Sequence, residues 1–157
     1  MDINYFCLKF TVKKISMIKY YFILFIAICS TNIFAQSPEN WTSNELTKPS
    51  ALAATLKANK DVPVIFSVGP SAVIPNSIDI GMVKDEKNLD EFKKQLSNLP
   101  GSTNILIYCG CCPYEHCPDV RPAIAALQSM KFTNYHLLDL PHNIKTDWIA
   151  KGYPVKE

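Results

Sequence analysis

Four cysteines lie within nine residues of the sequence, in the segment Cys109-Gly-Cys-Cys-Pro-Tyr-Glu-His-Cys117. Thiols at this density transfer sulfur or electrons as nucleophiles, bind a soft metal ion, or pair in disulfides. The same segment contains an imidazole, His116, and is followed by Arg121, the only arginine of the chain. The segment is therefore the candidate functional site, and its chemistry is that of sulfur.

The cysteine segment lies between a predicted strand and a predicted helix. Residues 104–108 form an apolar run, and residues 122–130 carry apolar side chains at helical spacing. A loop from a parallel strand to the next helix opens at the sheet edge where α/β proteins bind their ligands. The N–H groups that begin such a helix also stabilise a nearby thiolate. We therefore expect Cys109 to lie at this edge as a nucleophile that faces the start of the helix.

The rest of the chain shows strands that alternate with helices. Residues 36–49 are polar and predicted to be irregular, with Trp41 as their anchor. The pattern then predicts strands at residues 63–68 and 135–140, helices at residues 50–59, 88–99 and 143–151, and a broken strand or loop at residues 72–80. This order indicates right-handed βαβ units. We therefore predict one three-layered α/β domain over residues 36–157, with a central parallel sheet.

The first 35 residues have the pattern of a secretory signal peptide. Basic residues precede the apolar run of residues 20–28, and Ala35 marks the expected cleavage position. The run is shorter than the roughly 20 apolar residues that span a membrane, so no membrane span is expected after cleavage. We therefore expect export to the periplasm or the exterior. Cys29 offers a rival interpretation as a lipid-modified cysteine, which the bulky isoleucine before it disfavours.

The charge of the expected mature segment is nearly balanced. Residues 36–157 carry 12 basic and 13 acidic side chains, whereas the full chain has a formal net charge of +2. Without a basic stripe, nucleic acid is not expected as a partner. Cys7 and Cys29 would leave with the signal peptide, so all the remaining cysteines lie in the candidate site. In an oxidising compartment such thiols pair, bind a metal ion or are kept reduced.

Three sequence features together resemble those of single-domain rhodanese-like proteins. They are the turn Ile74-Pro-Asn-Ser-Ile78, the strand that ends in Tyr108-Cys109, and the closing motif Trp148-Ile-Ala-Lys-Gly-Tyr-Pro-Val155. The resemblance covers nearly all of residues 36–157 and implies a rhodanese-like three-layer fold. It also implies a sulfurtransferase in which Cys109 carries sulfane sulfur as a persulfide. Sulfur would pass from a small sulfur-containing anion such as thiosulfate to cyanide or a partner thiol, and no cofactor would be required.

The candidate site departs from the family pattern. The loop after Cys109 is longer than in the family, and the Arg-Ser pair that opens the family's helix aligns with Asp119-Val120. Arg121 is close to that position but displaced, and the resemblance implies it as a second catalytic residue. The family's Asp-x-Arg after the first strand is replaced by Ser67-Val-Gly69, and its Gly-Gly before the last helix by Pro141-His-Asn-Ile144. Standard transfer of sulfur from thiosulfate to cyanide is therefore in doubt.

The other thiols leave several alternatives open. Cys109 and Cys112 form a Cys-x-x-Cys motif, which suits reversible dithiol–disulfide chemistry. In that case Cys111, Cys112 or Cys117 acts as a resolving or auxiliary thiol. A disulfide between Cys112 and Cys117 would instead staple the loop of a catalytically inactive interaction domain.

A metal site is a further alternative. Thiolates and imidazole favour zinc or copper(I), and the candidate ligands are Cys109, Cys111, Cys112, His116 and Cys117. The other two histidines have other expected roles. His136 lies in an apolar strand and is interpreted as a core histidine. His142 follows the end of that strand and is an outside candidate for acid–base help at the same sheet edge.

Overall fold

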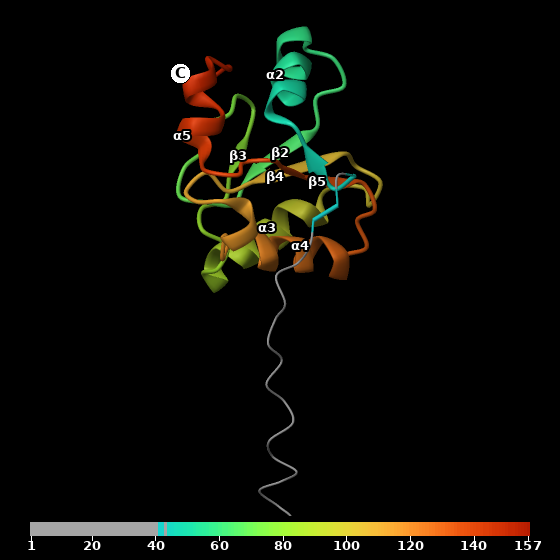
Figure 1. The fold of residues 1–157 in the computed structure, drawn as a ribbon. Coiled ribbons are helices and arrows are strands. Elements are labelled where there is room, and N and C mark those ends of the chain that lie inside the picture. The colour runs from blue at the N-terminus through green and yellow to red at the C-terminus, as the bar shows by residue number, and fades with distance from the viewer. Residues whose placement is uncertain (1–40, 43) are drawn as a thin grey trace, which may run out of the picture. The chain divides into compact units, whose positions relative to one another are not determined.

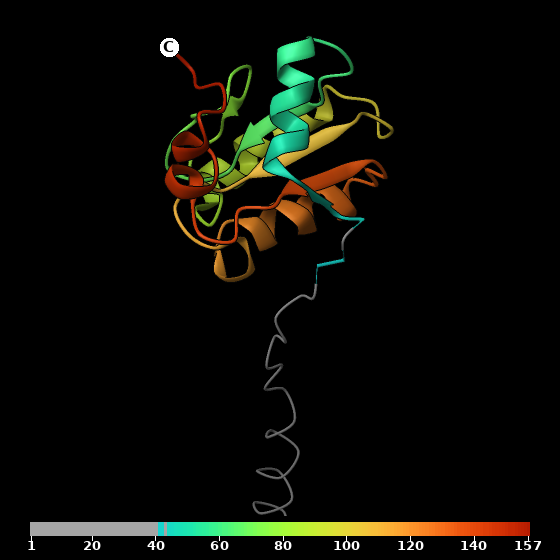
Figure 2. The same ribbon diagram turned by 45° about the horizontal axis from the view of Figure 1, so that its top comes forward.

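The computed structural model describes residues 41, 42 and 44–157, which form a layered α/β domain (Figures 1 and 2). Its strands are β1 (Leu46–Thr47), β2 (Val64–Ser67), β3 (Ile78–Asp79), β4 (Ile105–Tyr108) and β5 (Tyr135–Leu138). Its helices are α2 (Pro49–Ala58), α3 (Glu86–Ser97), α4 (Val120–Ser129), α5 (Ile144–Asp147) and the short 3-10 turns η1 (Tyr114–His116) and η2 (Ile149–Lys151).

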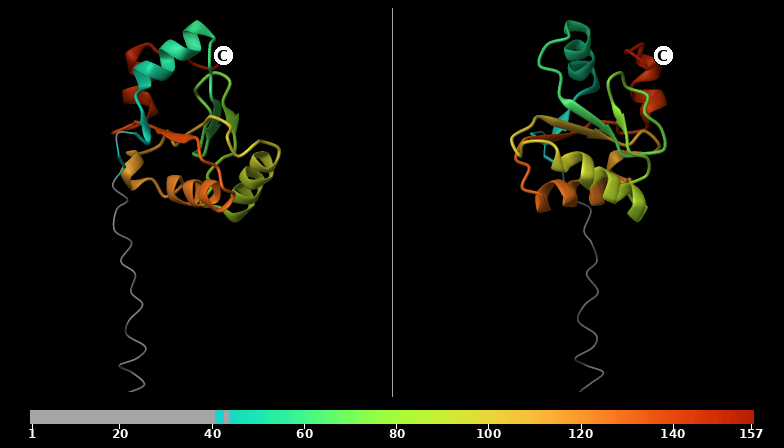
Figure 3. Two further views of the ribbon diagram at one scale, coloured as in Figure 1. Left: turned by 90° about the vertical axis from the view of Figure 1, so that its right-hand side faces the viewer. Right: turned by 180° about the vertical axis from the view of Figure 1, so that it is seen from behind.

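All five strands are parallel and lie in the order β1-β5-β4-β2-β3. Helices α2 and α5 cover one face of the sheet, and α3 and α4 cover the other (Figures 1 and 3). Strand β4 lies in the middle, and all four of its residues are buried. Continuous burial explains why its sequence is an unbroken apolar run rather than an alternating one. The predicted α/β class, parallel sheet and three layers are confirmed.

Alternate residues of β4 belong to two different hydrophobic cores. Ile105, Ile107 and the following Cys109 pack on the α3–α4 face. Leu106 and Tyr108 pack on the α2–α5 face. This alternation follows from the two-residue period of a strand. It places the Cys109 side chain on the same side of the sheet as the start of α4.

The structure differs from the sequence prediction at the two ends of the domain. The segment predicted to be irregular contains β1, which pairs with β5 through Leu46 and Thr47. A two-residue strand is too short to show a period in sequence, and its pairing depends on the free edge of β5. The predicted last helix divides into α5 and η2 at Trp148.

The predicted signal peptide and Cys29 lie outside the described residues. Among the residues that are described, none belongs to a helix with the length and apolar character needed to span a membrane. The predicted anchor Trp41 is partly buried against the core of the α3–α4 face.

The hydroxyl group of Tyr108 joins β4 to the turn that precedes β3. It accepts hydrogen bonds from the backbone N–H groups of Val73 (2.9 Å) and Ile74 (3.2 Å), and it lies 3.2 Å from the Ser77 hydroxyl. The Tyr108 side chain is fully buried. The tyrosine of the Tyr-Cys pair therefore has a structural role on the opposite face of the sheet from the cysteine.

We expect Tyr108→Phe to lower the free energy of unfolding by about 1–3 kcal/mol, because it leaves two N–H groups without their acceptor. Urea denaturation measures this loss. Tyr135→Phe is the matched control: it removes a hydroxyl from a half-buried tyrosine of β5. An equal effect of both substitutions would contradict the role assigned to Tyr108.

Candidate functional site

Cys109 directly follows β4 at the carboxyl end of the central strand, and its side chain is 1% exposed. The adjacent chain makes room for its sulfur. A methyl group at Gly69, just after β2, would lie 2.8 Å from Cys109 Sγ, which is closer than van der Waals contact allows. A side chain at Gly69 would therefore collide with the Cys109 thiol, which fills that space.

The loop after β4 brings the four cysteines together. The Sγ atoms of Cys109, Cys111, Cys112 and Cys117 all lie within 4.8 Å of one another, and we call these residues the cysteine cluster. Cys109 Sγ is 3.3 Å from Cys111 Sγ, which is 3.4 Å from Cys112 Sγ. All four are free thiols in the structure. Cys109 and Cys117 are buried, Cys112 is half-buried and Cys111 is exposed, so the cluster reaches from the core to the surface.

The loop is held against the end of β5 and the start of α5. The Ile144 N–H group donates to the Gly110 carbonyl (3.0 Å), and the Tyr114 N–H group donates to the Leu140 carbonyl (3.3 Å). Packing at Gly110 is also tight, since a methyl group there would lie 2.9 Å from the Ile144 side chain. Residues 140–144 thus support the cysteine loop through backbone hydrogen bonds at Leu140 and Ile144.

The start of α4 faces Cys117 rather than Cys109. The Cys117 pKa is lowered from 9.0 to about 6 by a hydrogen bond from the Cys109 thiol, against the opposing effect of burial. Backbone N–H groups of Asp119 and Val120 also donate to the Cys117 sulfur and lower its pKa further. N–H groups at a helix N-terminus stabilise an adjacent anion in this way. Cys117 is therefore the thiolate of the cluster.

The pKa values of Cys109 and Cys112 are raised, so these two thiols stay protonated near neutral pH. The pKa of Cys109 is raised, first by its hydrogen bond with Cys117 and then by burial. Burial, followed by the hydrogen bond with Cys111, raises the pKa of Cys112 to about 12. Because one negative charge disfavours a second nearby, the Cys117 thiolate opposes ionisation of Cys109 and Cys112. The sequence analysis expected the thiolate at Cys109. In the structure the lowered pKa belongs to Cys117, the hydrogen-bond partner of Cys109.

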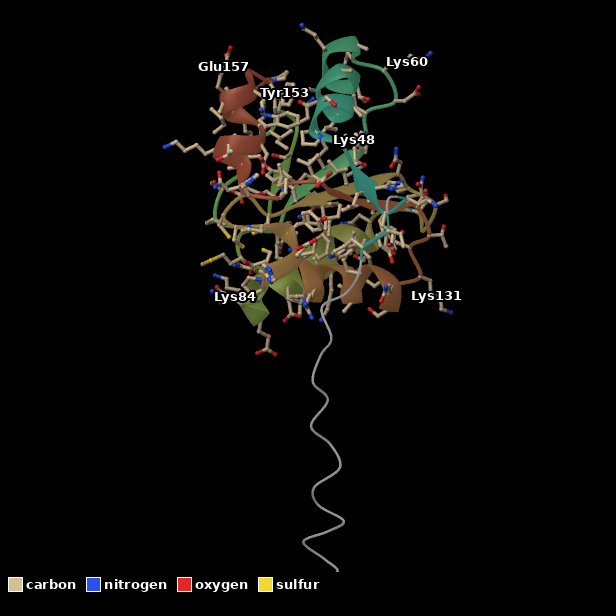
Figure 4. All side chains as sticks on the ribbon, viewed as in Figure 1. Lys48, Lys60, Lys84, Lys131, Tyr153 and Glu157 are labelled. Carbon is tan, nitrogen blue, oxygen red and sulfur yellow. The ribbon has the colours of Figure 1, made fainter. Side chains whose placement is uncertain are left out.

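Asp119 is a site residue that the sequence analysis missed. Its side chain is 1% exposed. One carboxylate oxygen accepts a hydrogen bond from the backbone N–H group of Lys84 (2.9 Å), and the other lies 4.0 Å from Cys109 Sγ. An aspartate just before a helix is usually a helix cap, but the Asp119 side chain makes no capping hydrogen bond. Figure 4 shows side-chain sulfur atoms on the same side of the molecule as Lys84.

His116 and Arg121 are the remaining predicted site residues. His116 is exposed in η1 and does not belong to the group of close sulfur ligands. Arg121 is half-buried in the first turn of α4, and it forms no salt bridge with any residue in the described part of the chain. The structure thus brings together Cys109 and the predicted auxiliary thiols, and it leaves His116 outside this group of close ligand atoms.

The surroundings of the two other histidines are also defined: His142 pairs with an aspartate, and His136 is less buried than expected. The His142 ring lies 3.0 Å from an Asp147 carboxylate oxygen and is exposed, so its partner is this aspartate. His136 is half-buried in β5 rather than enclosed in the core. It lines a surface cavity with Asn104 and Asn134 at the amino ends of the strands.

No protein-family model matches the sequence, and no curated protein matches it significantly. Among solved structures, the rhodanese-like domain of an Anabaena sp. protein is similar, with a TM-score of 0.51 and 19% identity over 71% of this chain and 78% of that domain. A rhodanese-related protein from Thermoplasma volcanium has a TM-score of 0.45 and 19% identity over 71% of this chain and 97% of that one. A variant of EanB in complex with hercynine has a TM-score of 0.48 and 14% identity over 71% of this chain and 27% of that one. The similarity to the Anabaena domain shows that this chain has a rhodanese-like fold.

In the reduced, metal-free protein we expect one thiolate to form with a midpoint near pH 6, because hydrogen bonds hold the Cys117 pKa about there. Its ultraviolet absorbance should be lost as the pH falls below this value. Cys117→Ser should remove this transition. Cys111→Ser should retain it, since Cys111 is not among the groups that shift the Cys117 pKa. A first thiolate that forms only near pH 9 would contradict this assignment.

Proposed function

We propose that the protein is a rhodanese-like sulfurtransferase that holds sulfane sulfur as a persulfide on Cys109. The observation that carries this proposal is the position of Cys109, directly after the central strand of a rhodanese-like fold and within 4.8 Å of three further thiols. We also propose that the N-terminal segment directs export, so that the mature protein acts outside the cytoplasm on a small sulfur-containing anion or a partner thiol.

In the first step of this mechanism, Cys109 takes a sulfur atom from a donor such as thiosulfate. The Cys109 thiol donates a hydrogen bond to the Cys117 sulfur, so the Cys117 thiolate accepts its proton. The Cys109 thiolate then attacks the outer sulfur of thiosulfate. The sulfur–sulfur bond of the donor breaks, sulfite leaves with the bonding electron pair, and Cys109 becomes a persulfide.

The second step moves the sulfur from the core to the surface. Cys109 is buried, whereas Cys111 is exposed and its Sγ lies 3.3 Å away. Cys111 attacks the outer sulfur of the persulfide. The bond from that sulfur to Cys109 breaks, the Cys111 proton passes to the Cys109 sulfur, and a persulfide forms on Cys111. An acceptor thiol then removes that sulfur at the surface. Cys111 thus serves acceptors that are too large to reach Cys109.

Dithiol–disulfide exchange is the second candidate function, and the close approach of the cluster sulfurs favours it. If Cys117 attacks the inner sulfur of a Cys109 persulfide, hydrosulfide leaves and a Cys109–Cys117 disulfide forms. The sulfane sulfur is then reduced by two electrons, and the two cysteines are oxidised by two. A dithiol reductant would have to restore the two thiols. Dithiol–disulfide exchange therefore leaves two fewer free thiols after turnover than sulfur transfer does.

We expect the reduced, metal-free protein to take up about one sulfur atom per chain from thiosulfate or polysulfide, measurable as thiocyanate after treatment with cyanide. Cys109→Ser should abolish this labile sulfur, because it removes the carrier atom. Cys112→Ser is the matched control and should retain it. The proposal fails if Cys109→Ser, shown to be folded by circular dichroism, still holds as much labile sulfur as the unchanged protein.

Cys111→Ser should separate loading from delivery. We expect it to load normally but to pass sulfur to a protein thiol about tenfold more slowly or worse, because the exposed relay is missing. Delivery to cyanide, which is small, should change less. Loss of both acceptors to the same extent would show instead that Cys111 acts in loading.

A further inference from the structure

We infer that the cysteine cluster is also a four-thiolate binding site for a thiophilic metal ion, with zinc as the best fit and copper(I) as the alternative. The ligands are the sulfur atoms of Cys109, Cys111, Cys112 and Cys117. This inference is independent of the proposed sulfur transfer, since it depends on where the four sulfur atoms lie and not on their reactivity.

The positions of the sulfur atoms suit tetrahedral coordination. A zinc ion with four sulfur ligands at about 2.3 Å requires the sulfur atoms to lie about 3.8 Å apart. In the cysteine cluster two of these distances are 3.3 and 3.4 Å, and all pairs lie within 4.8 Å. Displacements of up to about 1 Å therefore suffice, and rotation of cysteine side chains can supply them.

Backbone N–H groups donate hydrogen bonds to two of the sulfur atoms. The Cys111 N–H group donates to the Cys109 sulfur, and those of Asp119 and Val120 donate to the Cys117 sulfur. Hydrogen bonds of this kind orient metal-bound ligands and offset their negative charge. The two buried ligands are thus fixed in position without a metal ion, which lowers the cost of assembling the site.

The charges of the site favour a cation. A carboxylate oxygen of the buried Asp119 lies 4.0 Å from Cys109 Sγ. Four thiolates beside this carboxylate would repel one another strongly without a positive ion between them. A metal ion can enter from the loop surface, where Cys111 is exposed and Cys112 is half-buried.

The structure also reduces the set of ligands expected from sequence. The sequence alone admits His116 as a ligand, but the group of mutually close ligand atoms contains only the four thiols. Four sulfur ligands at the corners of a tetrahedron suit zinc. Copper(I) is satisfied by fewer thiolates, so it would leave part of the cluster unused.

The test is titration of the reduced, metal-free protein with zinc against a chromophoric chelator, together with a count of the thiols that zinc protects from alkylation. We expect one zinc ion per chain and protection of all four thiols. Cys111→Ser and Cys112→Ser, which change the less buried ligands, should each weaken zinc binding by about tenfold or more. His116→Ala is the matched control and should leave zinc affinity unchanged. Cobalt(II) in place of zinc should give the sulfur-to-metal absorption of tetrahedral thiolate coordination.

Three results would overturn the inference. They are failure to bind zinc stoichiometrically, loss of affinity in His116→Ala equal to that in the cysteine variants, or binding of copper(I) alone with only two thiols protected. Cys112→Ser separates this inference from the proposed function, because it should lose zinc affinity yet keep the labile sulfur. Zinc should also block sulfur loading in the unchanged protein, since both use the Cys109 sulfur.

Discussion

The arrangement of the site depends on the contact between the start of α4 and the Cys117 sulfur. Backbone N–H groups of Asp119 and Val120 have no helical partner there, and they donate to this sulfur. The Cys109 thiol adds a third donor from the end of β4. These hydrogen bonds hold Cys117, the last cysteine of the loop, next to the end of the central strand. The loop consequently folds into a compact cluster of sulfur atoms rather than an extended surface segment.

The central strand contributes to this contact because its last residue, Tyr108, and the following Cys109 point to opposite faces of the sheet. Tyr108 points to the α2–α5 face, where its hydroxyl group fixes the turn before β3. Cys109 points to the α3–α4 face, where Gly69 leaves space for its sulfur and Asp119 lies beside it. Gly69 and the buried Asp119 therefore both border the Cys109 sulfur and limit where it can lie.

The sequence predicted most of the fold, because long apolar runs such as β4 and the regular spacing along α3 carry strong periodic signals. It missed β1, whose two residues depend on pairing with β5. At the site, the clustering of four thiols was evident from spacing alone. The roles of Cys117 and Asp119 were not, because they depend on how the loop returns to α4, and a loop path leaves no periodic pattern.

The most direct test of this account is the intact mass of the protein purified without reductant, before and after alkylation of its thiols. We predict a gain of about one sulfur atom, which peptide mapping assigns to Cys109 and which is absent from Cys109→Ser. A loss of four hydrogen atoms with no thiol open to alkylation would mean that the cluster is closed by two disulfides. That result would contradict a sulfur-carrying site and would leave the loop a structural staple.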